Sequence, residues 1–142
     1  MFGEVFIPEA VFRELERPAT PSAVATWLSR PPAWLHIEKI SEFPLDERLE
    51  KLGEGEREAI LLSVAKGPDV LLLIDEYKGR QEAARRQITF MGLVGVLDKA
   101  AAAGIVDLPV TIEKLLRTNF RVFPDLLQTI LDLDANRKRQ AP

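Results

Sequence analysis

A wholly apolar run, VLLLI at residues 70–74, limits the choice of folds more than any other part of the sequence. Residues 53–67, just before it, place apolar side chains at helical spacing, and Gly67 and Pro68 end that helix. A short strand without polar residues is typical of parallel sheets, where both faces are buried. Helical patterns and apolar runs alternate along the rest of the chain. The sequence therefore predicts an α/β domain with a mostly parallel sheet.

The predicted elements leave no linker long enough to divide the chain, so we expect a single domain over residues 1–133. Residues 134–142 form a basic polar tail, which we expect to be frayed. The predicted strands are residues 4–7, 34–40, 70–74 and 88–91. The predicted helices are residues 8–16, 22–29, 53–67, 79–87, 92–103, 111–118 and 124–131, with a short helical turn in residues 46–52.

Composition narrows the classes of function. The chain has 142 residues, 46% of them apolar, which is enough for a packed core. A net charge of −3 gives no overall attraction to nucleic acid, so such binding would need a local basic patch. The absence of cysteine excludes disulfides and thiolate ligands. No apolar run approaches a membrane span, and the first ten residues carry Glu4 without a basic region, so we expect a cytoplasmic protein.

The segment VLLLIDEYKGR, residues 70–80, resembles a magnesium-binding strand end of an ATPase. An ATPase also needs the phosphate-binding loop G-x-x-x-x-G-K-[ST], and none of the eight glycines precedes a lysine. The only histidine, His36, lies in a predicted strand, and no G-x-S-x-G turn occurs. These absences argue against an ATPase and a serine hydrolase. No G-x-G-x-x-G motif supports a dinucleotide site.

Carboxylates remain as the candidates for chemistry. Glu14, Glu56 and Asp75, with Glu76 as a fourth, lie next to the predicted ends of elements. Carboxylate oxygens suit Mg²⁺ or Mn²⁺, and such ions support phosphoryl chemistry. Each acid also has a structural interpretation, as a solvated helix residue, a helix-dipole partner or a helix cap. Asp75 is the strongest candidate because it directly follows a buried strand, where α/β sheets bind ligands.

Four segments in this order carry a resemblance to a known family: IPEAVFRELE, LGEGEREAILLSVAKG, VLLLIDEYKGRQEAARR and ITFMGLVGVLDKAAAAGIV. Together they resemble the PIN-like proteins of bacteria and archaea, which are described as nucleic-acid-binding proteins of unknown function. These proteins are relatives of the VapC-type toxins. The resemblance covers about residues 3–133. It implies a three-layer α/β/α domain and metal-dependent cleavage of RNA.

The resemblance also implies roles for individual residues. It makes Glu14, Glu56 and Asp75 the catalytic and metal-binding acids, assisted by Glu76, around Mg²⁺ or Mn²⁺. Arg80 would contact a phosphate or pair with a carboxylate. Lys78 and Arg85 are further candidates for contact with RNA. Gly92 and Gly95 match the family's G-x-x-G turn, which we interpret as helix–strand packing. The implied partners are RNA, a small antitoxin protein and a second copy in a dimer.

One departure from the family concerns the start of the chain. Family members open with a strand that ends in an aspartate, followed by a helix, and the sequence here begins at the segment after them. Because that strand lies in the middle of the family's sheet, we expect the loss of one metal ligand and impaired activity. Three explanations are open: a misassigned start codon, a truncated gene, or a rearranged fold in an intertwined dimer.

Two other classes of function stay open. A degenerate PIN-like domain that binds RNA or a protein without cleaving would show weak metal binding. A plain α/β domain that binds a nucleotide or small molecule would need a defined pocket rather than a carboxylate cluster.

Overall fold

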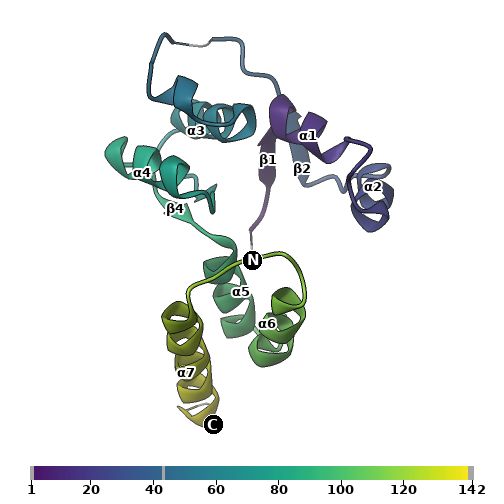
Figure 1. Ribbon diagram of the computed structural model, residues 1–142, viewed down its shortest axis with the longest axis vertical. Helices are drawn as coiled ribbons and strands as arrows, with labels where there is room; N and C mark the ends of the chain where they lie inside the picture. The colour runs from purple at the N-terminus through teal and green to yellow at the C-terminus, as the bar shows by residue number, and fades with distance from the viewer. Residues whose placement is uncertain (1, 43, 141–142) are drawn as a thin grey trace. The chain divides into compact units, whose positions relative to one another are not determined.

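The computed structural model describes residues 2–42 and 44–140. They form two compact units, Phe2–Met91 and residues 92–140, which we call the N-terminal unit and the C-terminal unit. The described residues contain seven α-helices and four strands, and every strand pairing is parallel (Figure 1). The predicted α/β class with parallel strands is confirmed.

The first strand pair of the N-terminal unit joins β1 (Val5–Pro8) to β2 (Leu35–Glu38). Parallel neighbours need a long connection, because the chain must return to the same end of the sheet. Here the connection contains α1 (Glu9–Leu15) and α2 (Ser22–Leu28). The structure thus contains all four elements predicted for this part of the chain, with ends shifted by a few residues.

The second strand pair joins β3 (Leu72–Leu73) to β4 (Phe90–Met91), with α4 (Tyr77–Arg85) as the connection. A 3₁₀ turn (Leu49–Lys51) and the long helix α3 (Glu54–Lys66) precede it. The strands form two separate two-stranded sheets, β1–β2 and β3–β4, among the described residues. The sequence patterns could not show this division, because they do not specify which strands pair.

Strand β3 differs from its prediction. Residues 70–74 were expected to be buried on both faces, but only Leu72 and Leu73 are in the strand. Leu72 and Ile74 are 5% and 7% exposed, whereas Leu73 between them is 49% exposed. Successive side chains of a strand point to opposite faces, so Leu72 and Ile74 lie on a covered face and Leu73 lies on a face that the described residues leave open.

The core of the N-terminal unit lies between α3, α4 and the second strand pair. Its buried members are Leu49, Ile60, Leu72, Ile74 and Ala83. A buried carboxylate links this core region to α1: Glu58 of α3 is 5% exposed and accepts a hydrogen bond of 3.1 Å from the N–H of Ala10. That bond satisfies a backbone donor in the first turn of α1, which has no partner within its own helix.

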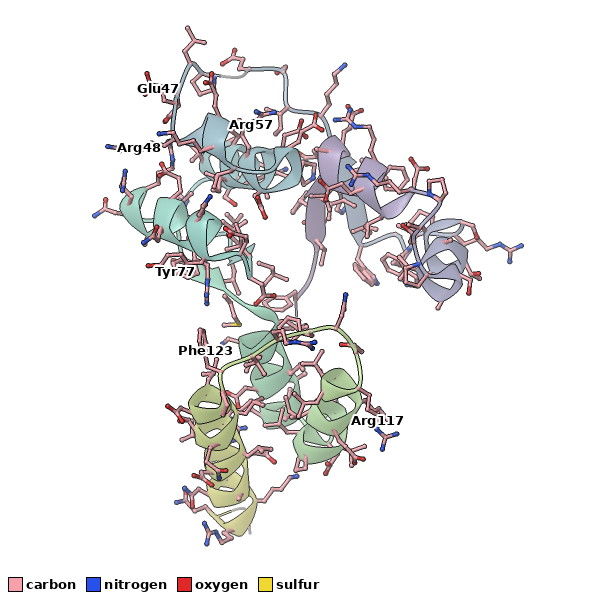
Figure 2. All side chains as sticks on the ribbon, viewed as in Figure 1. Glu47, Arg48, Arg57, Tyr77, Arg117 and Phe123 are labelled. Atoms are coloured by element: carbon pink, nitrogen blue, oxygen red, sulfur yellow. The ribbon has the colours of Figure 1, made fainter. Side chains whose placement is uncertain are left out.

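The C-terminal unit consists of α5 (Leu93–Ala102), α6 (Leu108–Leu116) and α7 (Pro124–Gln140). Val94, Leu108, Ile112 and Ile130 form its buried core. Phe123, just before α7, is 76% exposed (Figure 2). None of the described helices combines the length and apolar character needed to cross a membrane.

Helix α7 continues well beyond its predicted end at residue 131, through most of the expected tail. Asp134 is buried and accepts from Arg137 at 3.3 Å and from Lys138 at 3.0 Å. Arg137 also reaches Asp98 of α5 at 2.6 Å, and Lys138 reaches Asp107 at 3.2 Å. These ion pairs hold the last turns of α7 against the other two helices, so residues 134–140 are helical where the prediction expected fraying, and residues 141–142 of the predicted tail lie outside the described residues.

Candidate metal and nucleic-acid site

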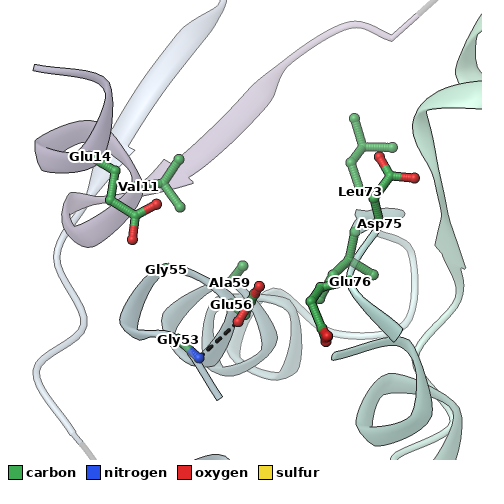
Figure 3. A pocket seen from close by; sticks show the side chains of 10 residues that line it. Val11, Glu14, Gly53, Gly55, Glu56, Ala59, Leu73, Asp75 and Glu76 are labelled. Carbon is green, nitrogen blue, oxygen red and sulfur yellow. Dashed lines mark hydrogen bonds between the residues drawn. The ribbon is translucent and has the colours of Figure 1, made fainter. Parts of the chain in front are cut away.

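A pocket of about 420 Å³ lies in the N-terminal unit where α1, the start of α3 and the end of β3 meet (Figure 3). All four predicted acids line it. The full lining is Val11, Glu14, Gly53, Gly55, Glu56, Ala59, Leu73, Ile74, Asp75 and Glu76. Four carboxylates from three elements that are far apart in sequence therefore share one pocket.

Glu14 reaches the pocket because α1 and α3 pack closely at Gly55. A Cβ atom at Gly55 would lie 3.3 Å from both carboxylate oxygens of Glu14 and 3.1 Å from Cγ2 of Val11. Gly55 is buried in the first turn of α3. A second link joins the same elements nearby, since Arg13 donates to Glu54 at 2.8 Å. The absence of a side chain at Gly55 is what allows the Glu14 carboxylate to approach this helix.

Glu56 lies in the first turn of α3, where its carboxylate satisfies a backbone donor. Its Oε2 accepts a hydrogen bond of 2.8 Å from the N–H of Gly53 (Figure 3). A Cβ atom at Gly79 of α4 would lie 4.0 Å from Cγ of Glu56, so the first turns of α3 and α4 are neighbours. An acid in the first turn also interacts favourably with the helix dipole. Glu56 thus lies at the start of a helix, as its helix-dipole interpretation predicts, and also lines the pocket.

Asp75 and Glu76 lie just beyond the end of β3, after Ile74. Glu76 is the N-cap of α4, and its Oε2 accepts from the N–H of Gly79 at 3.0 Å. Its neighbour Asp75 is exposed and lines the pocket. The capping role was anticipated for Asp75, but the structure assigns it to the next residue.

The donor chemistry of the pocket fits Mg²⁺ or Mn²⁺, which bind carboxylate oxygens. The geometry is less complete, because no three acidic or histidine side chains in the described ranges 2–42 and 44–140 lie close enough together to hold a metal ion. Two of the four acids, Glu56 and Glu76, also serve as helix caps. The pocket therefore gathers suitable ligands without arranging them as a coordination sphere.

The predicted RNA-binding residues lie on α4 and differ in their contacts. Lys78 is exposed. Arg85 lies 3.9 Å from Glu82. Arg80 is half-buried, and in the described part of the chain its Nε has no hydrogen-bond partner and its guanidinium has no ion pair. Two roles were open for Arg80, contact with a phosphate and pairing with a carboxylate. Among these residues Arg80 forms no carboxylate pair.

Sequence reasoning missed an ion-pair network beside the core. Arg86 of α4 donates to Glu82 at 3.0 Å and also to Asp46 in the loop before α3. Glu82 is buried, so its charge needs this partner. The N–H of Arg48 and the guanidinium of Arg86 lower the pKa of Asp46. No sequence signal links residues 46 and 86, because only folding brings them together.

His36 is a partly exposed residue of strand β2, as its sequence context predicts. Its ring stacks on Phe6 with centroids 5.0 Å apart, and its Nε2 lies 3.5 Å from Glu4. It does not line the pocket.

In a comparison with known families, the chain matches the model of a family described as PIN domain over residues 1–136. The chain belongs to the PIN-domain family. The predicted family resemblance is confirmed, and the mixed α/β fold with parallel strands agrees with it. The match supports a nuclease-type domain, since PIN domains typically bind nucleic acids and generally use divalent metal ions. No curated protein and no solved structure matches the chain.

Proposed function

We propose that this PIN-domain protein is a metal-dependent ribonuclease that hydrolyses RNA phosphodiesters. Glu14, Glu56 and Asp75 are the proposed catalytic acids, and Glu76 is a further metal ligand. The observation that carries the proposal is that all four acids line one pocket. The chain has 22 acids, and solvated acids would have no reason to converge from three elements.

Mg²⁺ or Mn²⁺ at these carboxylates would activate water and stabilise the leaving oxygen of the phosphodiester. The capping bonds of Glu56 and Glu76 both use Oε2. The other oxygen of each carboxylate is left to bind a cation. The helix ends also hold these side chains in place, because each cap fixes a carboxylate against its own backbone.

We propose that Arg80, Lys78 and Arg85 contact the RNA backbone. Arg80 is the strongest of the three, because its guanidinium has no ion pair among the described residues. Lys78 is exposed in the first turn of α4, next to Glu76 of the pocket. Phosphate contacts of this kind make binding weaken as salt concentration rises.

A non-catalytic PIN domain that binds RNA or a protein partner is the second candidate. The favouring observation is that no three acidic side chains of the described residues are close enough to share a metal ion. This candidate predicts weak metal binding and no cleavage.

The family resemblance further supports three proposals about context. We propose a small antitoxin protein as a natural partner, a homodimer as the assembly and the cytoplasm as the location. Sedimentation analysis of the purified chain tests the dimer. A monomer at all concentrations would contradict it.

Cleavage of single-stranded RNA with and without Mn²⁺ tests the nuclease proposal. Asp75→Asn removes a charge from the pocket, and Asp69→Asn makes the same change at an exposed residue outside it. We expect Mn²⁺-dependent cleavage that Asp75→Asn abolishes and Asp69→Asn retains. RNA binding without cleavage in all three proteins would favour the non-catalytic candidate.

A further inference from the structure

Trp27 and Trp34, the two tryptophans of the chain, lie side by side in the N-terminal unit. Their ring centroids are 6.1 Å apart, and the ring planes are tilted by 45°. Trp27 is 44% exposed and Trp34 is 46% exposed. A tryptophan that only filled the core would be largely buried, because burial of its large ring is strongly favourable. The two residues, which we call the tryptophan pair, thus leave much of their surface uncovered by the described residues.

The backbone around the tryptophan pair is held by hydrogen bonds, so both residues are in place before a ligand arrives. Trp27 lies in the last turn of α2, and its carbonyl accepts from the N–H of Arg30 at 3.3 Å. The carbonyl of Trp34 accepts from the N–H of Val5 in β1 at 2.8 Å. Residues 31–32, between them, are both proline, whose ring fixes one backbone dihedral. A preformed site avoids the entropic cost of ordering a loop on binding.

The segment that carries the tryptophan pair differs in charge from the rest of the chain. Residues 17–37 are the longest stretch of the sequence without an acid, and they contain Arg17 and Arg30. The whole chain, in contrast, has a net charge of −3. Arg30 is exposed, and its guanidinium has no hydrogen bond or ion pair within the described ranges. The segment therefore supplies the kind of local positive charge that nucleic-acid binding needs in an acidic protein.

Two acids border the strand pair that follows this segment, Glu4 just before β1 and Glu38 at the end of β2. Glu38 pairs with Lys66 at 2.5 Å, and the carboxylate of Glu4 lies 3.5 Å from Nε2 of His36. Lys66 therefore offsets the charge of Glu38. The charge of Arg30 remains available for an anion from outside the chain.

Exposed indole rings beside an unpaired guanidinium match the chemistry of a single-stranded nucleic acid. Proteins bind such strands by stacking unpaired bases on aromatic side chains, while basic side chains contact the phosphates. A double helix offers no free base faces, because its bases already stack on one another. A protein segment could cover indole rings as well, but the absence of acids and the unpaired Arg30 favour a polyanion.

We propose that the tryptophan pair stacks on unpaired bases of single-stranded RNA and that Arg30 contacts an adjoining phosphate. The inference rests on RNA as the ligand in the proposed function, and it specifies that the substrate is unpaired RNA. Helices α2 and α4 lie on opposite sides of the N-terminal unit, with α1 and α3 between them (Figure 1). RNA that contacts both the tryptophan pair and the basic residues of α4 therefore has to be several nucleotides long.

The test uses the intrinsic fluorescence of the tryptophan pair in the full chain, without metal. The probe is a single strand of nine uridines. Because the chain has no other tryptophan, quenching by the bases reports stacking at these two rings. We expect saturable quenching. An oligomer of nine abasic ribose phosphates carries a similar charge without bases and should bind at least tenfold more weakly, with no quenching.

Substitutions of the tryptophan pair separate stacking from charge. With fluorescein-labelled nonauridylate, Trp27→Leu and Trp34→Leu should each weaken binding about tenfold, as expected for the loss of one stacked base. Phe123→Leu is the matched control, because it removes an aromatic ring that is 76% exposed and belongs to the C-terminal unit. This control should bind RNA like the native chain.

The role of Arg30 is measured by the dependence of binding on salt concentration. Loss of one phosphate contact to a single strand lowers the slope of log K against log salt by about 0.7, which we expect for Arg30→Gln. Arg117→Gln is the control, since Arg117 is exposed and already pairs with Glu113 in the C-terminal unit. An unchanged slope in Arg30→Gln would overturn the phosphate contact.

Absence of quenching by nonauridylate would overturn the proposal, as would equal binding of the abasic oligomer. A blue shift of the emission that grows with protein concentration and prevents quenching would also overturn it, because a second copy of the chain would then cover the rings. If a tryptophan variant does not fold, the two oligomers still decide the question with the native chain. Quenching without cleavage would contradict only the nuclease proposal, and cleavage without quenching would contradict only this inference.

Discussion

The close contact at Gly55 is the residue-scale feature on which the pocket depends most. Gly55→Ala would place a Cβ atom 3.1 Å from Val11 and 3.3 Å from the Glu14 oxygens, so Glu14 has to move by a few tenths of an ångström. We predict Mn²⁺ affinity about tenfold weaker, the lower end of the effect for residues that position metal ligands. Isothermal titration calorimetry measures this change.

The same substitution should leave stability nearly unchanged, because alanine favours a helix over glycine by about 1 kcal/mol and offsets the tighter contact. Gly3→Ala is the matched control, since a Cβ atom there meets nothing within 4 Å. Unchanged Mn²⁺ affinity in Gly55→Ala would show that Glu14 is not a ligand.

At the scale of elements, Gly79 determines how closely α4 packs on β3. A Cβ atom at Gly79 would lie 2.4 Å from Cδ1 of Ile74, which is 7% exposed and belongs to the core. Overpacking of this kind costs about 1–3 kcal/mol, whereas the gain in helix propensity is about 1 kcal/mol. We therefore predict that Gly79→Ala lowers the free energy of unfolding by roughly 1 kcal/mol in urea titrations. A stabilised variant would contradict the close packing.

A second prediction for the elements concerns the start of α6. Asp107 is its N-cap and accepts from the N–H of Val110 at 3.1 Å. That bond and the Lys138 ammonium lower the pKa of Asp107 below its ordinary value of 3.8. The stabilisation is present above the pKa of the unfolded chain and is lost as the pH falls through the lower pKa of the folded state.

We therefore expect the melting temperature of the native protein to fall at low pH more steeply than that of Asp107→Asn, which cannot lose this charge. Near neutral pH, Asp107→Ala should melt at a lower temperature than Asp107→Asn, because asparagine can keep the capping bond. Equal melting temperatures for the two variants at neutral pH would show that the cap does not stabilise α6.

Local patterns allowed the elements to be predicted, but not their pairing. Residues 53–67 read as a helix because apolar side chains recur at helical spacing, and α3 matches that prediction. The double burial predicted for residues 70–74 was wrong at Leu73, since the burial of each strand face depends on the elements that pack against it, which can be distant in sequence. The helical tail was missed because Asp98 and Asp107, which bind it, are distant in sequence.

The candidate site could also be predicted only in part, because local patterns show where elements end but not which distant residues come into contact. Glu14, Glu56, Asp75 and Glu76 stood out because each lies near the end of an element, and all four line the pocket. The contact that admits Glu14 beside Gly55 joins residues 41 positions apart, and no local pattern indicates it.

At the scale of the whole molecule, each of the two units has its own buried cluster. We nevertheless propose a single cooperative domain, because a unit of about 50 residues has too small a core to be stable alone. Urea unfolding followed by circular dichroism and by tryptophan fluorescence should give coincident transitions. Both tryptophans are in the N-terminal unit, so separate transitions would reveal independent folding and contradict the proposal.

We propose that four acids from three elements form one site for a divalent metal ion. Direct Mn²⁺ binding, measured by electron paramagnetic resonance on the native chain and on Asp75→Asn, Glu56→Gln and Asp69→Asn, tests it. We expect one Mn²⁺ per chain, lost in the first two variants and retained in Asp69→Asn, because Asp69 lies outside the pocket. Binding that is absent from the native chain, or unaffected by Asp75→Asn and Glu56→Gln, would contradict the claim.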